Sequence, residues 1–336
     1  MDRVLVILGA TATGKSAAAM AVATRTGAEI VNADALQAYR RLDIGTGKPT
    51  PAERARVPHH LVDILEPEVR FSAGSFARLA RTAIAEIQAR GRLAIVVGGS
   101  GLYLRALLQG LSPLPEGSET LRNELRERAA REGSETLHAE LARLDPASAA
   151  RLPKRDQQRV VRALEVTLST GRPFSEWLSR APEQVPLPAL RIGLTLPRPI
   201  LYDRIGARVR AMLAAGWLDE VMRLLREGVE PQSPAFQAIG YREMTKCALG
   251  EWNLALATAE TMGATRRFAK RQETWFRKEP DVVWVAAEKP ETVESEIRRL
   301  MSKVGLGRTN DNDEAQHQYS GRVPVPEPQG GAGGGG

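Results

Sequence analysis

Strand-like and helix-like segments alternate over the first 112 residues. Buried apolar strands are predicted at residues 4–8 and 93–97, and a further strand at residues 29–32. Helical segments at residues 16–26 and 72–90 separate them, and each is followed by a glycine, which commonly ends helices. Continuous apolar strands between helices are typical of a parallel sheet covered on both faces. The predicted fold class is therefore α/β.

The middle of the chain has a different pattern. Residues 118–180 contain no strand-like run, and their leucines follow helical spacing, which predicts a small helical insertion. A strand returns at residues 191–196, followed by amphipathic helices, a long helix over residues 254–278 and a short strand at 282–285. A final helix is expected to run to about residue 303.

This pattern predicts two structural units and a tail. The α/β core comprises residues 1–112 and 190–303, and the helical insertion domain comprises residues 113–189. From residue 307 to 336 the chain loses its apolar residues and ends in a stretch rich in Pro and Gly. That composition predicts a disordered tail.

A glycine-rich motif directly follows the first strand. Residues 9–16 read GATATGKS, which fits GxxxxGK(S/T) between a buried strand and a helix. In such a P-loop, backbone N–H groups, the lysine ammonium and the helix N-terminus surround a phosphate chain, and the final hydroxyl can ligate Mg²⁺. The core is therefore predicted to be P-loop NTPase-like. The predicted polyphosphate-binding residues are Gly9, Ala10, Thr11, Ala12, Thr13, Gly14, Lys15 and Ser16.

Two more features fall at the carboxyl ends of strands, where open parallel sheets bind ligands. Asp34 follows one strand, and Gly98, Gly99 and Ser100 follow another. Asp34 has three interpretations: a water-mediated Mg²⁺ ligand, a general base, or a cap of the following helix. The paired glycines allow something bulky to approach the backbone beside the Ser100 hydroxyl.

The motifs of nucleotide hydrolases are incomplete. The strand at residues 93–97 ends in Gly-Gly-Ser, whereas hydrolases commonly place an Mg²⁺-holding aspartate at such a strand end. The sequence also has no guanine-reading Asn-Lys-x-Asp motif. Both absences weigh against an ATPase or a GTPase.

Charge and rare residue types narrow the range of partners. The net charge of +7 suits nucleic acid or an anionic membrane, although an Arg-rich composition alone would give the same value. One cysteine and four histidines cannot build a disulfide framework or a Cys/His zinc site. No signal-peptide pattern and no apolar stretch of about 18 residues is present, which predicts a cytoplasmic protein without a membrane partner.

Positive charges concentrate in two separated segments. Residues 151–162 carry five cations near the start of a predicted helix, and residues 266–278 carry six. On a helix, Arg266, Lys270 and Arg277 share roughly one face. The aromatic residues among them either stack on unpaired bases or belong to the core. Basic clusters on both sides of a phosphate-binding core suggest a polyanion larger than a nucleotide.

These motifs, in this order, resemble the tRNA dimethylallyltransferase (tRNA isopentenyltransferase) family. The resemblance spans about residues 3–300 and includes DALQAYRRLDIGTGKP from residue 34 and VGGSGLY from residue 97. Later matches are DQQRVVRALE from residue 156 and TRRFAKRQETW from residue 265. The sequence has no Cys/His finger near its C-terminus and so resembles the bacterial type. Ala35 and Ser100 depart from the family pattern, which has Ser and Thr there.

The resemblance implies transfer of a dimethylallyl group from dimethylallyl diphosphate to N6 of the adenosine 3′-adjacent to the anticodon (position 37) of tRNA. It implies Mg²⁺ on Ser16, Asp34 as general base, and Ser100 orienting the amine or a phosphate oxygen. The implied partners are the tRNA anticodon stem-loop and dimethylallyl diphosphate, with no obligate protein partner. The implied tRNA contacts are Asp34, Ala35, Leu36, Gln37, Arg122, Gln158, Arg159, Arg162, Arg266, Lys270 and Arg277.

Two other functions stay open at this point. An ATP-dependent kinase for a small molecule or nucleotide would use the same P-loop, with Asp34 activating a hydroxyl group. A non-enzymatic RNA-binding module would use the P-loop only as a switch. A kinase consumes ATP without RNA, whereas the binding module turns over nothing.

Overall fold

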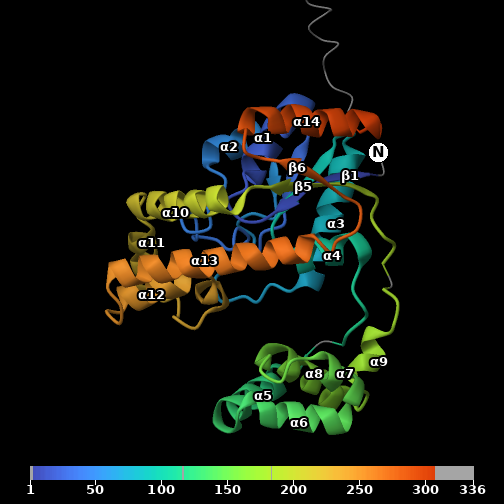
Figure 1. Ribbon diagram of the computed structural model, residues 1–336, viewed down its shortest axis with the longest axis vertical. Helices are drawn as coiled ribbons and strands as arrows, with labels where there is room; N and C mark the ends of the chain where they lie inside the picture. Colours follow the sequence, from blue (N-terminus) through green and yellow to red (C-terminus); the bar gives the residue numbers. More distant parts are fainter. Residues whose placement is uncertain (1–2, 116, 183, 307–336) are drawn as a thin grey trace, which may run out of the picture.

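A six-stranded parallel sheet forms the centre of the computed structural model, which describes residues 3–115, 117–182 and 184–306 (Figure 1). The strand order is β3-β2-β4-β1-β5-β6, and all neighbouring strands are parallel. The strands are β1 (Val4–Gly9), β2 (Glu29–Asn32), β3 (His59–His60), β4 (Ala94–Gly98), β5 (Ala189–Thr195) and β6 (Val282–Ala286). Their carboxyl ends therefore lie at the same edge of the sheet.

Strand β1 lies inside the sheet and is buried along its whole length. Successive side chains of a strand point to opposite faces, and those of β1 join two different apolar clusters. The register pairs Leu8 with Gly98 of β4 and Gly9 with Leu194 of β5. The end of β1 is thus held from both sides where the glycine-rich loop begins.

Helices cover both faces of the sheet. Helices α1 (Lys15–Thr26), α10 (Arg198–Ala214) and α14 (Pro290–Lys303) contribute apolar side chains to one cluster. Helices α3 (Ala73–Ala89) and α4 (Gly101–Gln109) contribute to the cluster on the other face. The prediction of a parallel α/β sheet covered on both faces is confirmed.

A further helical layer extends the core beyond the sheet. Helices α11 (Trp217–Arg226), α12 (Tyr241–Ala248) and α13 (Leu254–Phe276), with the 3₁₀ turn η1 (Pro234–Gln237), enclose an apolar cluster. Its largest members, Trp217, Phe236 and Tyr241, are fully buried. Helix α13 leaves this cluster, contacts β1 and α4, and ends with Phe276 in the core of the sheet. It therefore connects the outer layer with the strand ends.

A helical body stands apart from the sheet. Its helices are α5 (Glu119–Glu132), α6 (Ser134–Leu144), α7 (Pro146–Arg151), α8 (Gln157–Thr170) and α9 (Phe174–Leu178). They share an apolar cluster of their own, in which Leu125, Leu137 and Leu164 are buried. Figure 1 shows this body at one end of the long axis of the molecule, away from the sheet. The helical spacing of leucines between residues 121 and 144 predicted α5 and α6.

Some features fall outside what the sequence pattern predicts. Strand β3 has two residues and helix α2 (Pro51–Arg56) has six, so neither is long enough to show a periodicity. The tail expected at residues 307–336 lies outside the described residues. In the part of the chain that the structure describes, no helix is long and apolar enough to cross a membrane.

Residues 43–48, which belong to the DALQAYRRLDIGTGKP stretch, are held by a buried carboxylate. Glu220 of α11 accepts hydrogen bonds from the backbone N–H groups of Asp43 and Ile44 at 2.8 Å and of Gly45 at 3.4 Å. It also accepts one from the Tyr241 hydroxyl at 2.6 Å. A Cβ on Gly45 would lie 2.0 Å from the Trp217 indole, so only glycine fits there. We call this arrangement the Glu220 clamp.

We expect Glu220→Gln to destabilise the fold. The neutral amide weakens the charge-assisted hydrogen bonds of the clamp and turns an NH₂ donor toward other donors. The free energy of unfolding should fall by about 2–3 kcal/mol, as for lost hydrogen bonds to a buried charge. Thermal unfolding followed by circular dichroism measures this loss. Glu227→Gln, at an exposed ion pair with Arg223, should melt like the wild type, and equal losses would contradict the clamp.

Candidate active site

The glycine-rich loop has the backbone of an anion-binding turn. Ala12 and Gly14 adopt left-handed φ values of 64° and 95°, and helix α1 begins directly afterwards at Lys15. Turns of this kind, followed by the unpaired N–H groups of a helix start, create a concave site for phosphate. Glycine is required at position 9, because a Cβ there would lie 2.6 Å from the carbonyl oxygen of Leu194.

Lys15 folds back over this loop. Its Nζ donates a hydrogen bond to the carbonyl oxygen of Ala10 at 2.6 Å, and the Thr13 hydroxyl donates to the same oxygen at 2.9 Å. Burial lowers the pKa of Lys15 to about 8, an effect that the Asp34 carboxylate opposes and the Arg208 guanidinium increases. Lys15, Asp34 and Arg208 therefore act on one another electrostatically.

Arg208 of α10 is a site residue that the sequence did not predict. Burial lowers its pKa, and the negative charge of Asp34 opposes this shift. The guanidinium donates a hydrogen bond to the carbonyl oxygen of Thr46 at 3.3 Å and lies close over Gly47, where a Cβ would be 2.3 Å from it. Two partly desolvated cations facing one carboxylate leave net positive charge, which suits an anion. An arginine on an amphipathic helix gives no local signal of this role.

Asp34 is held in place by its own turn. Asn32 accepts a hydrogen bond from the N–H of Asp34 and donates one to its carbonyl oxygen, both at 3.0 Å. Oδ1 of Asp34 accepts from the N–H of Leu36 at 2.9 Å, a local turn of the kind that the capping interpretation expects. Within the described residues, Oδ2 has no hydrogen-bond partner. One oxygen thus holds the turn and the other is available to a ligand.

The residues after Asp34 lie in the same loop. Ala35, Leu36 and Gln37 are half-buried. The Gln37 amide donates hydrogen bonds to the carbonyl oxygens of Thr46 and Gly47 at 3.4 and 3.1 Å, so it ties this loop to the stretch held by the Glu220 clamp.

Ser100 stands at the start of α4 without capping it. Its side chain makes no capping hydrogen bond, so the hydroxyl is free among the described residues. The two glycines before it are explained by the protein itself. A Cβ on Gly98 would lie 2.2 Å from the carbonyl oxygen of Ala33, and one on Gly99 would lie 2.3 Å from Nε2 of Gln272. The bulky groups that approach the glycine pair are thus parts of this chain.

Ser16 provides the hydroxyl expected of a metal ligand. It is exposed in the first turn of α1, and its hydroxyl makes no hydrogen bond within the described residues. No group of three or more His, Cys, Asp or Glu residues that could hold a metal ion occurs in the described part of the chain. A hydroxyl and the nearby Asp34 carboxylate are oxygen donors, which suit Mg²⁺ bound mainly through phosphate oxygens.

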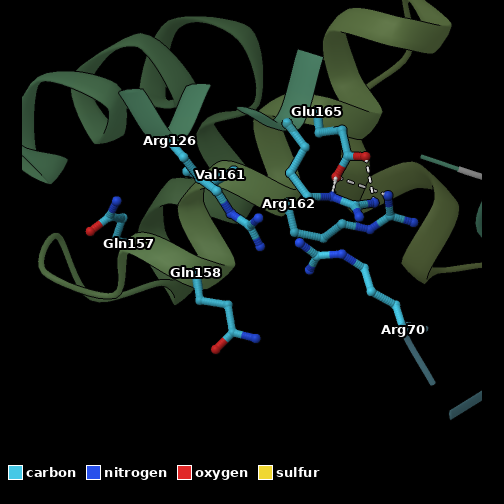
Figure 2. Close-up of a pocket in the computed structure, with 8 residues that line it drawn as sticks. Arg70, Arg126, Gln157, Gln158, Val161, Arg162 and Glu165 are labelled. Atoms are coloured by element: carbon cyan, nitrogen blue, oxygen red, sulfur yellow. Dashed lines mark hydrogen bonds and ion pairs between the residues drawn. The ribbon is translucent and has the colours of Figure 1, made fainter. Parts of the chain in front are cut away.

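A second, strongly basic site lies where the helical body meets the core. A pocket of about 610 Å³ lies at this place, and Figure 2 shows the residues that line it. Most of its lining comes from α5 and α8, and Arg70 comes from the core. The lining residues are Arg70, Arg122, Arg126, Gln157, Gln158, Val161, Arg162 and Glu165. We call it the arginine pocket.

Glu165 holds two of the arginines of this pocket in place. Its fully buried carboxylate accepts hydrogen bonds from Arg122 at 3.1 and 2.7 Å and pairs with Arg162 at 3.1 Å. Burial, and then the charges of Arg70 and Arg122, lower the pKa of Arg126. With one carboxylate among its arginines, the pocket stays positive and suits phosphate groups. The sequence indicated Arg122, Gln158 and Arg162 but missed Arg70 and Arg126.

The other predicted RNA contacts lie in different surroundings. Arg159 is exposed and pairs with Asp156 at 2.7 Å, outside the arginine pocket. Arg266 and Lys270 are exposed on α13. Arg277 lines a cavity of about 220 Å³ that also includes the first residues of the glycine-rich loop. Of the aromatic residues on this helix, Phe276 is part of the core.

The site combines a P-loop at the edge of a parallel sheet, a carboxylate beside that loop, and a basic helical body. These features define a P-loop protein that binds anionic ligands. A family profile described as IPP transferase matches residues 37–279. The chain is 47% identical over 285 residues to the tRNA dimethylallyltransferase of Geobacter metallireducens, covering 84% of this chain and 92% of that protein. It is 47% identical over 289 residues to that of Thermomicrobium roseum, covering 85% and 87%. The chain belongs to the IPP transferase family and is a transferase.

Solved structures have the same fold. The tRNA isopentenylpyrophosphate transferase from Bacillus halodurans is 34% identical, with a TM-score of 0.66 over 94% of this chain and 100% of that one. A eukaryotic dimethylallyltransferase acting on tRNA is 25% identical, with a TM-score of 0.76 over 94% of this chain and 80% of that one. The predicted P-loop NTPase-like core with a helical insertion agrees with these neighbours.

Inorganic diphosphate should bind less tightly as the pH rises above about 8, the pKa to which burial brings Lys15. The ammonium attracts the anion and the neutral amine does not. The contribution of Lys15 should therefore be constant below this pKa and fall above it, by up to about tenfold per pH unit. Isothermal titration calorimetry from about pH 6.5 to about pH 9.5 measures the affinity.

Lys15→Arg is the control for this pH dependence. Arginine stays charged throughout the range, and the titration of diphosphate itself is common to both proteins. The ratio of the two dissociation constants therefore isolates the titration of Lys15. A ratio that does not change with pH would show that Lys15 keeps its charge.

Proposed function

We propose that the protein transfers the dimethylallyl group of dimethylallyl diphosphate to N6 of the adenosine 3′-adjacent to the anticodon of tRNA, position 37. The observation that carries this proposal is the free oxygen of Asp34, which lies within electrostatic reach of two partly desolvated cations at the P-loop. Such a site can hold a diphosphate and accept a proton at the same place. The names of the relatives support the same reaction.

The diphosphate is assigned to the P-loop. The N–H groups of residues 9–16 that make no hydrogen bond within the protein, together with Lys15 and Arg208, would hold it and stabilise the charge that develops as the C–O bond of the donor breaks. Mg²⁺ bound through Ser16 would supply further neutralisation of the leaving diphosphate. Water attack is not part of this reaction, which agrees with a β4 strand that ends without an aspartate.

Asp34 is assigned as the general base. The lone pair of N6 is delocalised into the adenine ring, so the amine is a poor nucleophile. As the new C–N bond forms and diphosphate departs, Oδ2 of Asp34 would take the proton from N6, while Oδ1 keeps its bond to the N–H of Leu36. The free hydroxyl of Ser100 would orient the amine or a phosphate oxygen.

The anticodon stem-loop is assigned to the helical body and to α13. The arginine pocket would hold backbone phosphates, and Arg266, Lys270 and the half-buried loop at Ala35, Leu36 and Gln37 would contact the RNA nearer the active site. The adenosine must leave its stack to reach Asp34, so contacts away from the reacting base must supply this energy. We propose residues 113–189 as the RNA-gripping domain.

One incubation tests the proposed function. The protein is mixed with unmodified tRNA and labelled dimethylallyl diphosphate, and transfer of label into the RNA is measured. Transfer that depends on both substrates supports the proposal. Consumption of ATP without RNA would identify a kinase instead, and RNA binding with no turnover would identify a binding module.

We expect Asp34→Asn to lower turnover by roughly 100-fold or more, as general-base losses typically do. The amide preserves the hydrogen bond to the N–H of Leu36 and removes the basic oxygen. The affinity for the donor should change little in comparison. Single-turnover transfer assays and donor titrations separate the two effects. Near-normal turnover would show that Asp34 serves only to hold its turn.

The affinity for tRNA should fall steeply between about 50 and about 200 mM salt. Each phosphate contact contributes a slope of about 0.7–0.9 in a plot of log affinity against log salt. Arg126→Gln removes a pocket cation that makes no ion pair in the described residues, so it should flatten the slope by about one contact. The donor KM should stay unchanged, because the donor binds at the P-loop.

Arg267→Gln and Arg271→Gln are the controls for the RNA contacts. Both side chains are exposed on α13, where Arg267 lies 4.0 Å from Glu260 and Arg271 lies over the Phe268 ring. They should behave as ordinary solvated charges. The proposed RNA contacts would be contradicted if the affinity for tRNA did not depend on salt, or if the control substitutions weakened binding as much as Arg126→Gln does. The net positive charge would then reflect only the composition of the chain.

A further inference from the structure

Gln272 of α13 joins two loops of the active site that are far apart in the sequence. Its Oε1 accepts a hydrogen bond from the backbone N–H of Thr11 in the P-loop at 2.9 Å. Its Nε2 donates one to the carbonyl oxygen of Gly99, next to Ser100, at 2.8 Å. Both polar atoms of this amide are therefore engaged, one on each side of the site.

The surroundings of Gln272 leave it little freedom. The residue is buried, with 6% of its surface exposed. A Cβ on Gly99 would lie 2.3 Å from Nε2, so the backbone of that turn comes close to the amide. Trp275, one turn further along α13, packs against Gly101 in the same way and lies beneath the Arg105 guanidinium. Helix α13 is thus pressed against the turn that carries Ser100.

The primary amide of Gln272 satisfies both loops at once. The N–H of Thr11 needs an acceptor and the carbonyl of Gly99 needs a donor, and one primary amide supplies both. A carboxylate supplies only acceptors and an apolar side chain supplies neither. Unsatisfied buried backbone groups are costly, so the two loops would move if the amide were lost.

The same helix carries cations assigned to RNA. Arg266 and Lys270 are exposed on α13, within two turns of Gln272. An RNA held by these cations would constrain the helix whose Gln272 bonds to both the P-loop and the turn before Ser100. The two active-site loops and the proposed RNA contacts therefore share one helix.

We propose that Gln272 is a positioning residue that couples tRNA binding on α13 to the binding of the donor diphosphate. The proposal rests on the function proposed above and adds a link between its two substrates. Because such a link is reciprocal, tRNA tightens donor binding by the same factor as the donor tightens tRNA binding. Gln272 acts through the backbone of Thr11 and Gly99 and does not itself take part in the chemistry.

Gln272→Met tests this link. Methionine has similar length and volume and no amide. The affinity for inorganic diphosphate is measured by calorimetry with and without an unmodified anticodon stem-loop RNA, and steady-state transfer is measured in parallel. In the wild type, RNA should tighten diphosphate binding severalfold. In the variant we expect diphosphate to bind about tenfold more weakly and the effect of RNA to disappear, while RNA alone binds within twofold of the wild type.

Two further variants separate this role from a general loss of stability. Thr274→Ala changes an exposed residue on the same helix, whose hydroxyl bonds only to the carbonyl oxygen of Lys270, and should behave like the wild type. Gln272→Glu keeps an acceptor for Thr11 but repels the carbonyl of Gly99 and adds negative charge near the diphosphate. It should therefore raise the donor KM more than Gln272→Met does, even though it restores one of the two contacts.

Retention of the RNA effect on diphosphate binding in Gln272→Met would overturn the inference. So would a variant that only melts at a lower temperature while its kinetic constants and the coupling stay those of the wild type. The binding measurements need no turnover. A wild-type protein that shows coupling but transfers no label would refute the proposed function and leave the link intact. Transfer without coupling in the wild type would refute the link alone.

Discussion

The proposed active site depends on how closely the ends of β1, β2 and β4 approach one another. The N–H of Ala33 donates to the carbonyl oxygen of Val97 at 2.7 Å, and a Cβ on Gly98 would lie 2.2 Å from the carbonyl oxygen of Ala33. At this spacing the loops that follow the three strands share one edge of the sheet. The P-loop, Asp34 and Ser100 meet there because the strand order places their strands side by side.

The charges of Lys15, Arg208 and Asp34 at this edge of the sheet do not balance one another, and a bound anion would complete them. Burial disfavours the positive charge on both Lys15 and Arg208, and Asp34 offsets only part of that cost. A bound diphosphate would restore favourable interactions for both cations. The carboxylate that steadies the cations in the free protein is the same group assigned to the proton transfer. Only Oδ1 of Asp34 bonds to the N–H of Leu36. The carboxylate can therefore keep its turn and still offer Oδ2 for the proton transfer.

Local patterns in the sequence predict those parts of the molecule whose residues are consecutive. The apolar runs predicted the longer strands, and GATATGKS predicted the P-loop, because the backbone of that loop is formed by eight consecutive residues. Arg208, Arg70 and Gln272 each contribute a single side chain from a distant element, with Thr11 and Gln272 separated by 261 positions. The stretch at residues 43–48 is equally instructive. It helped to indicate the family, yet its described contacts with Glu220 are structural.

A separate helical body has a physical advantage for a reaction on a stacked base. Removing an adenosine from its stack costs a few kcal/mol, and the reacting edge of the base offers few contacts to offset that cost. The arginine pocket is built on a different apolar cluster from the sheet, so the phosphate contacts proposed for it would gain energy away from the chemistry. The P-loop is then free to be shaped for diphosphate alone. The two sites then need one structural element that contacts both. Helix α13 packs on β1 and α4 and has exposed cations, so it has the contacts for this role.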